Sequence, residues 1–128
     1  MKIAKLEKAL KKSWHRETCY PPIQEQWTKE NPAFGQCAVT ALIVQDFFGG
    51  ELIFCSHQNH FWNRLLDGKE IDLTRGRFPK GTKLCIDQVF QRHEILQGEA
   101  AEKAKTEERY ISLLNEFLYM LRSEGDRY

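Results

Sequence analysis

An apolar run over residues 38–48 is the feature that most constrains the fold of this chain. It reads Ala-Val-Thr-Ala-Leu-Ile-Val-Gln-Asp-Phe-Phe and is closed by the pair Gly49-Gly50. Pro32 and Gly35 mark a loop before it. A run of this length between chain breakers predicts a helix that is apolar, and therefore buried, over most of its surface. We expect the fold to be organised around this helix.

Cys37 stands at or just before the first turn of this helix. Unpaired backbone N–H groups and the positive end of the helix dipole meet at that position. Both favour the thiolate, which is the form of cysteine that attacks carbonyl groups. Cysteine is also a common core residue, so an inert, buried Cys37 is the alternative that its position leaves open.

Composition predicts a soluble globular protein with one domain over residues 1–128. Hydrophobic residues make up 41% of the chain and charged residues 29%, and the net charge of +1 gives no general attraction to nucleic acid or anionic membranes. No apolar run approaches the ~20 residues of a membrane span, and the N-terminus lacks the apolar segment of a signal peptide. We therefore expect a cytoplasmic protein. Its four cysteines are far apart, without the spacing of a disulfide framework or a zinc knuckle.

The remaining elements follow from apolar periodicity. Helical spacing predicts a flanking helix near each terminus, over residues 2–14 and in a long stretch that follows charged residues 99–105 and stops at Gly125. Residues 51–55 and 84–90 are predicted strands, and residues 94–96 are interpreted as an edge strand.

Residues 60–65 and 70–74 alternate as two strands of a hairpin with Asp67-Gly68 in the turn. The loop length decides the chemistry, because it sets which side chains share a face of the sheet. With a two-residue turn, His60 and Asp72 would face opposite sides.

A three-residue loop over residues 66–68 gives the other register, in which Leu65 pairs with Lys69. His60 and Asp72 then become diagonal neighbours on one face, with Cα atoms ~7–8 Å apart. Apolar residues of the two strands gather on the opposite face. This register separates the polar from the apolar side chains more cleanly than the two-residue turn does. We therefore predict the three-residue loop.

Cys37, His60 and Asp72 supply the groups that catalysis by a cysteine nucleophile requires. Cys37 would attack, His60 would accept its proton, and Asp72 would fix the imidazole tautomer. The Cys37 backbone N–H would form half of an oxyanion hole. The sequence leaves Gln36, Gln26 and Gln24 open as donors of a second, side-chain amide. Trp27 and Trp62 complete the candidate substrate-binding residues.

Four segments resemble the small bacterial YunG-like proteins: "TCYPP", "NPAFGQCAVTALIVQDFFGGE", "HFWNRL" and "EIDLTRGRF". The likeness covers residues 14–78. The Gly35-Gln36-Cys37-Ala38 block, with His60 and Asp72 in the later blocks, is similar to the papain-like and transglutaminase-like superfamily. That resemblance implies an α+β, papain-like core, in which a helix with the nucleophile packs on an antiparallel sheet carrying His and Asp. The chain is much shorter than papain-type enzymes and lacks their second lobe.

We therefore expect a cysteine-dependent hydrolase or acyltransferase that acts on an amide or peptide-type bond through Cys37, His60 and Asp72. Its partner would be a peptide, protein or amide-containing substrate, with no cofactor, metal, nucleic acid or membrane. One alternative is an inactive papain-like fold that serves as a binding module, with Trp62 and a basic, solvated loop over residues 75–83 as its contact surface. Another is a small metal-binding protein.

The metal-binding alternative would use Cys55, His57 and His60. Zinc favours tetrahedral sites of sulfur and nitrogen, but the usual ligand spacings are absent from this stretch. The sequence does not indicate an oligomeric state.

Overall fold

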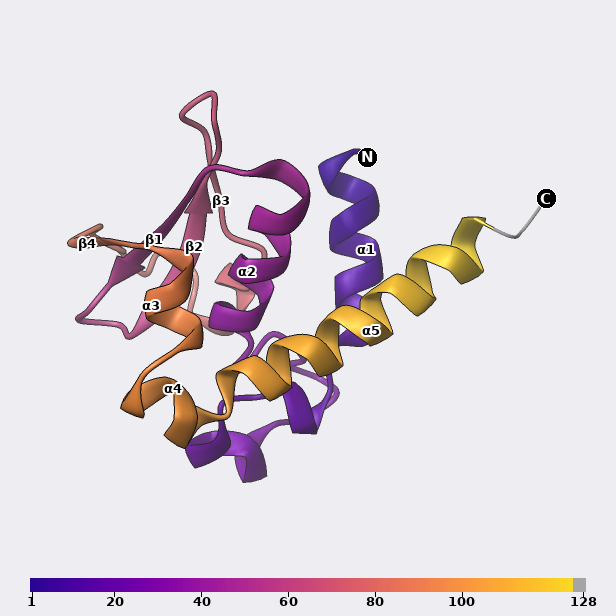
Figure 1. The fold of residues 1–128 in the computed structure, drawn as a ribbon, viewed down its shortest axis with the longest axis horizontal. Helices are drawn as coiled ribbons and strands as arrows, with labels where there is room; N and C mark the ends of the chain where they lie inside the picture. The colour runs from indigo at the N-terminus through magenta and orange to yellow at the C-terminus, as the bar shows by residue number, and fades with distance from the viewer. Residues whose placement is uncertain (126–128) are drawn as a thin grey trace.

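The computed structural model describes residues 1–125, which form a mixed α+β structure (Figure 1). In chain order the elements are α1 (Ile3–Ser13), η1 (Arg16–Thr18), η2 (Pro21–Gln26), α2 (Cys37–Phe48), β1 (Glu51–Cys55), β2 (His60–Arg64), β3 (Glu70–Ile71), η3 (Arg75–Arg77), β4 (Gln88–Phe90), α3 (Arg92–Leu96), α4 (Glu99–Ala104) and α5 (Thr106–Gly125). The strands form a four-stranded antiparallel sheet in the order β3-β2-β1-β4. The α+β class with a small antiparallel sheet is confirmed.

Helix α2 is buried between the sheet and the two flanking helices, as its apolar run predicted. Every residue from Val39 to Val44 is buried. On one side, Ile43 packs in a cluster with residues of α1 and α5, which lie side by side (Figure 1). On the other side, Leu42 packs against Leu52 of β1. The central helix is therefore fixed from both sides.

The opposite face of the sheet is also covered. Ile53, Cys55 and Trp62 form a buried cluster there, and Leu84, from the segment between β3 and β4, packs on it. A sheet with both faces covered accommodates buried residues at successive positions of β1. Strand β4 lies beside β1 and is shorter than the predicted strand over residues 84–90.

The β2–β3 hairpin has the predicted three-residue register. Asn63 pairs with Ile71, and the Leu65 N–H donates to the Lys69 carbonyl at 2.7 Å. The predicted length of the second strand is wrong, because β3 ends at Ile71. After that point the Asp72 carboxylate accepts the Thr74 backbone N–H at 3.2 Å, and this local bond turns the chain away from the ladder.

One C-terminal expectation is also corrected. Residues 94–96, expected as an edge strand, belong to helix α3, where the Glu94 carboxylate accepts the Gln91 N–H at 2.7 Å in a capping box. The long C-terminal helix, α5, follows residues 99–105 and ends at Gly125, as predicted. Before it, residues 99–104 form the separate helix α4, which ends where Lys105 adopts a left-handed conformation with φ +53°.

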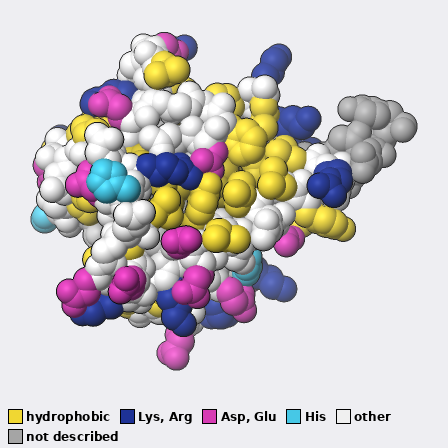
Figure 2. Space-filling view, viewed as in Figure 1, with side chains coloured by type: hydrophobic (Ala, Val, Ile, Leu, Met, Phe, Trp, Pro, Cys, Tyr) yellow, Lys and Arg dark blue, Asp and Glu magenta, His cyan; other side chains and the backbone are white. Residues whose placement is uncertain are grey.

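On the face shown in Figure 2, apolar side chains gather over the region where α2 and α5 pack together. The exposed large apolar residues of these two helices are Phe47, Ile111, Leu118 and Tyr119. Among the helices of residues 1–125, none has both the length and the apolar character needed to cross a bilayer.

Two glycines give a matched test of the packing between the end of α2 and the hairpin. Gly50 has φ +85°, and a Cβ there would lie 2.3 Å from the Arg64 carbonyl oxygen. Gly68 has φ +88°, with nothing within 4 Å of the same added atom. We expect Gly68→Ala to cost about 1–2 kcal/mol, the conformational penalty alone. Gly50→Ala should cost clearly more, because backbone atoms must also move. Urea denaturation of both variants measures the difference. Equal losses of unfolding free energy would contradict the close approach of Gly50 to the Arg64 carbonyl.

Candidate active site

Cys37 is the first residue of α2, and the loop before it holds it there. The Gln36 side chain makes no capping hydrogen bond to the helix, so the first N–H groups of α2 are not capped by it. Gly35 has φ +73°, and a Cβ at that position would lie 2.3 Å from the Cys19 sulfur. The Gly35 carbonyl accepts the Tyr20 N–H at 2.9 Å. This loop therefore requires glycine at position 35, two residues before the first residue of the helix.

His60 is the first residue of β2 and is fully buried. Its Nε2 lies 2.8 Å from the Asp72 Oδ2 atom. The imidazole stacks on the Trp62 ring at 5.8 Å and meets the Phe78 ring edge-on at 4.8 Å. These contacts fix the orientation of the ring.

Asp72 is held by bonds to both of its oxygens. Oδ1 accepts the Thr74 N–H at 3.2 Å and the Thr74 hydroxyl at 3.3 Å, and Oδ2 faces His60. Only 11% of the Asp72 side chain is exposed. A carboxylate in this position favours the tautomer with the proton on Nε2, which leaves Nδ1 for another partner.

The Cys37 sulfur lies at the open edge of β2. It is hydrogen-bonded to His60 and to the backbone N–H of Phe61. Alternate residues of a strand direct their N–H groups to the same edge. Leu65 uses that edge to pair with the residues before β3, but β3 ends too early to reach Phe61. The sulfur thus takes a place along β2 that a longer β3 would have filled.

These contacts set the charge states of the pair. Burial alone would raise the pKa of the Cys37 thiol, but the hydrogen bond and charge of His60 outweigh burial and lower it below its ordinary value. Burial would lower the pKa of His60, yet its hydrogen bonds with Asp72 and Cys37 raise it above its ordinary value. Both shifts favour a thiolate–imidazolium pair. The structure therefore brings together Cys37, His60 and Asp72.

Arg77 is a site residue that the sequence reasoning missed, because the basic loop over residues 75–83 was interpreted as solvated. Its Nε donates to Nδ1 of His60 at 3.2 Å, and its Nη2 donates to the Gln58 carbonyl at 3.1 Å. Its positive charge contributes to lowering the pKa of Cys37. Composition gave no signal that distinguished Arg77 from the other basic residues of the loop.

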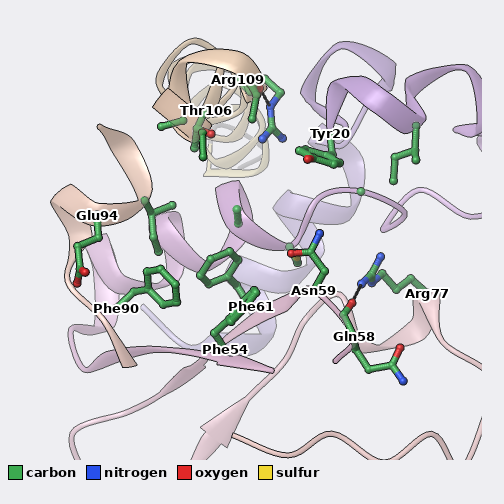
Figure 3. Close-up of a pocket in the computed structure, with 18 residues that line it drawn as sticks. Tyr20, Phe54, Gln58, Asn59, Phe61, Arg77, Phe90, Glu94, Thr106 and Arg109 are labelled. Carbon is green, nitrogen blue, oxygen red and sulfur yellow. Dashed lines mark hydrogen bonds between the residues drawn. The ribbon is translucent and has the colours of Figure 1, made fainter. Parts of the chain in front are cut away.

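A cavity of about 430 Å³ opens beside Cys37 (Figure 3). Its volume falls within the range typical of small-molecule sites. Phe54, Phe61 and Phe90 form an aromatic wall, and Asn59 and Arg109 supply polar groups from other directions. Cys37 therefore faces a space that a small substrate could enter.

The four residues expected to bind substrate do not line this cavity. Gln36 is fully buried, and its amide donates to a backbone carbonyl of the segment after α1. Gln26 is exposed at the end of η2. The indole N–H groups of Trp27 and Trp62 donate to a backbone carbonyl and to a carboxylate outside the cavity. Gln24, the third amide considered, also donates to backbone carbonyls.

The alternative metal ligands do not come together as a group of three. Cys55 is buried and pairs with His60 across β1 and β2, whereas His57 is exposed in the turn between the strands. Within residues 1–123, no three His, Cys, Asp or Glu side chains are grouped as metal ligands.

A family model described as YunG protein matches residues 2–121 of the chain. The chain is also similar to the uncharacterized protein YunG of Bacillus subtilis (strain 168), with 39% identity over 71 residues. That alignment covers 54% of this chain and 56% of the relative, so the chain spans about half the length of the curated relative. No solved structure matches this chain.

Alkylation by iodoacetamide across a pH range tests the state of the thiol. In a Cys85→Ser background, which removes the exposed cysteine, we expect Cys37 to react with an apparent pKa below the usual value of about 8.5. His60→Ala should raise the apparent pKa of Cys37. The hydrogen bond and charge of His60, which lower this pKa, are then absent, whereas burial still raises it.

The control is His57→Ala, which removes an exposed histidine of the same turn and should leave the alkylation profile unchanged. An unshifted Cys37 pKa in the parent protein would contradict the electrostatic account of the site. So would an alkylation profile that His60→Ala leaves unchanged.

Proposed function

The chain belongs to the YunG protein family, and we propose that it is a cysteine-dependent acyl-transfer enzyme, a hydrolase or acyltransferase acting on an amide-type bond. One observation carries the proposal. The Cys37 sulfur, the His60 ring and the Asp72 carboxylate are hydrogen-bonded in series beside a cavity. A nucleophile, a base in contact with it and a group that orients the base are the three parts that such chemistry requires.

We further propose that this core is related to the papain-like and transglutaminase-like enzymes. The support is the chain order of the three groups and their placement: Cys37 at a helix start, His60 on a strand, and Asp72 directly after the next strand. The helix that carries the cysteine packs on the antiparallel sheet that carries the histidine.

In the first half of the reaction, the Cys37 thiolate attacks the carbonyl carbon of the substrate. A C–S bond forms, and the carbonyl π electrons move onto oxygen. The oxyanion then re-forms the carbonyl while the C–N bond breaks, and the leaving nitrogen takes the proton from the His60 imidazolium. The products are an amine, an acyl thioester on Cys37 and a neutral imidazole.

In the second half, water or an amine attacks the thioester. His60 accepts a proton from the attacking group, the C–S bond breaks, and the thiolate–imidazolium pair is restored. With water, the balance is one amide and one water converted to a carboxylic acid and an amine. Asp72 stays ionised and orients the ring throughout.

The oxyanion needs two donors near the sulfur. The backbone N–H of Cys37 is one candidate, because it lies at the start of α2, where the helix offers it no partner. The Asn59 side chain is the other. It points into the cavity and makes no hydrogen bond with residues 1–125 (Figure 3). Asn59 has φ +49°, a conformation that asparagine tolerates better than most residues.

A binding module without catalysis is the second candidate, and one contact favours it. Arg77 donates to Nδ1 of His60, the nitrogen that must exchange a proton with the sulfur. In that arrangement the imidazole is neutral, and Arg77 competes with Cys37 for the same nitrogen.

Acylation by 4-nitrophenyl acetate separates the two candidates. We expect a burst of nitrophenol followed by slower turnover, with an acetyl group on Cys37 in the intact mass spectrum. Cys37→Ala should abolish the burst, whereas Cys85→Ser, which removes an exposed thiol, should retain it. Acetylation of Cys37 no faster than that of Cys85 would support the binding module instead.

Asp72→Asn tests the orienting carboxylate through the pH profile. The Asp72 hydrogen bond raises the pKa of His60, so its loss lets that pKa fall. The imidazolium is then lost at lower pH, and the alkaline limb of the acylation profile should move toward acid. The maximum rate should drop about 10- to 100-fold. Asp67→Asn, in the exposed hairpin turn, is the control. It should leave the alkaline limb and the maximum rate unchanged.

A further inference from the structure

Arg109 is a buried cation on the wall of the Cys37 cavity. It lies in the first turn of α5 and is only 5% exposed. Its Nε donates to the Ala104 carbonyl at 2.8 Å, and its Nη1 donates to the Thr18 carbonyl at 3.0 Å. Its Nη2 has no hydrogen bond with residues 1–125, and the side chain points into the cavity (Figure 3).

No carboxylate of residues 1–123 pairs with this guanidinium. Its neighbours are neutral carbonyls and the Tyr20 ring, whose centroid lies 5.9 Å from the guanidinium carbon. Burial lowers the pKa of Arg109, and the groups that oppose this effect are Cys37, Cys19 and Tyr20. Arginine nevertheless stays charged in proteins. A buried charge is costly unless it is paired, so the cavity holds a cation with an open position for an anion.

A purely structural role does not account for the charge. Neutral donors could supply the bonds to Ala104 and Thr18, and they would avoid the cost of desolvating a cation. The side chain is already desolvated by the fold, so a bound carboxylate would gain a charge-assisted hydrogen bond with little further desolvation of the arginine. The position therefore selects for an anionic ligand group.

The rest of the cavity is suited to an apolar group. The rings of Phe54, Phe61 and Phe90 pack together with centroids 4.5–5.3 Å apart and form the wall away from Arg109 (Figure 3). The acidic residue in the lining is Glu94, which caps α3 and lies beside Phe90. A ligand with a carboxylate at one end and an apolar body would match both regions.

We propose that the cavity binds a small carboxylate-bearing acyl substrate, with its carboxylate on Arg109 Nη2 and an aromatic or aliphatic group against Phe54, Phe61 and Phe90. The reaction at Cys37 rests on the proposed function, whereas the binding preference stands on the cavity alone. A thiolate–imidazolium pair at Cys37 and His60 is neutral overall, so it does not cancel the attraction of Arg109 for the carboxylate.

The test is calorimetric titration of the full chain with 3-phenylpropanoate and with its neutral analogue 3-phenylpropan-1-ol. We expect the carboxylate to bind the parent protein at least about tenfold more tightly, the usual effect of one charge-assisted hydrogen bond. Arg109→Gln should reduce the preference to within about twofold. Arg77→Gln tests the other arginine of the cavity, because a preference lost there and kept in Arg109→Gln would assign the carboxylate to Arg77. Arg75→Gln is the matched control, because it removes the same charge from an exposed arginine outside the cavity lining and should retain the preference.

Arg109 also holds backbone groups in place, so the folding of Arg109→Gln is checked by urea denaturation. Arg109→Lys, which retains the charge, is measured beside it. The comparison of the two ligands on the parent protein does not depend on either variant. Equal affinities, no binding of either ligand, or a preference lost only in Arg77→Gln would overturn the proposal.

The two proposals can fail separately. If the chain binds the carboxylate through Arg109 but 4-nitrophenyl acetate does not acylate Cys37, the ligand site stands and the acyl-transfer function is rejected. If Cys37 is acylated but the carboxylate shows no preference, the acyl-transfer function stands and the assignment of Arg109 is rejected.

Discussion

Burial of α2 on both sides is the constraint on which the rest of the structure depends. Its apolar residues pack toward α1 and α5 on one side and toward the sheet on the other. Two polar bonds reinforce this placement: the Trp14 indole donates to the Thr40 hydroxyl at 2.9 Å, and the Asn63 amide donates to the Ala41 carbonyl at 2.9 Å. A helix held in this way cannot rotate or slide easily, so its first residue, Cys37, keeps a fixed position relative to β2.

The site arises where regular structure stops. If β3 continued past Ile71, its backbone would pair with Phe61 and occupy the edge where the sulfur now lies. The turn at Asp72 ends the strand and also aims the carboxylate at His60. One aspartate thus closes the ladder, opens the strand edge and orients the base. The contacts among Cys37, His60 and Asp72 thus depend on the early end of β3.

Patterns that are local in the chain were predictable from the sequence. The register of the hairpin followed from its alternating side chains and Gly68, and the start of the buried helix at Cys37 followed from its apolar run. Helix α3 was missed because its short apolar stretch resembles a strand unless the cap formed by Gln91 and Glu94 is weighed.

Contacts that join distant segments were not predictable in this way. Arg77 and Arg109 come to Cys37 only through tertiary packing, and no periodicity marks either residue. The side chains of Gln36 and Trp27 donate to backbone carbonyls, and that of Trp62 donates to the Glu70 carboxylate. Chemical type alone could not indicate which polar side chains remain available to a ligand.

The cavity is assembled from segments that are remote in the chain: Tyr20 near the N-terminus, the central strands, and Arg109 at the start of the last helix. Closing such long loops comes late and at an entropic cost, so the walls cannot form before the termini have docked. While the chain emerges from the ribosome, Cys37 therefore has the ordinary chemistry of an unfolded thiol. The pairing of Cys37 with His60 is acquired only when these segments have come together.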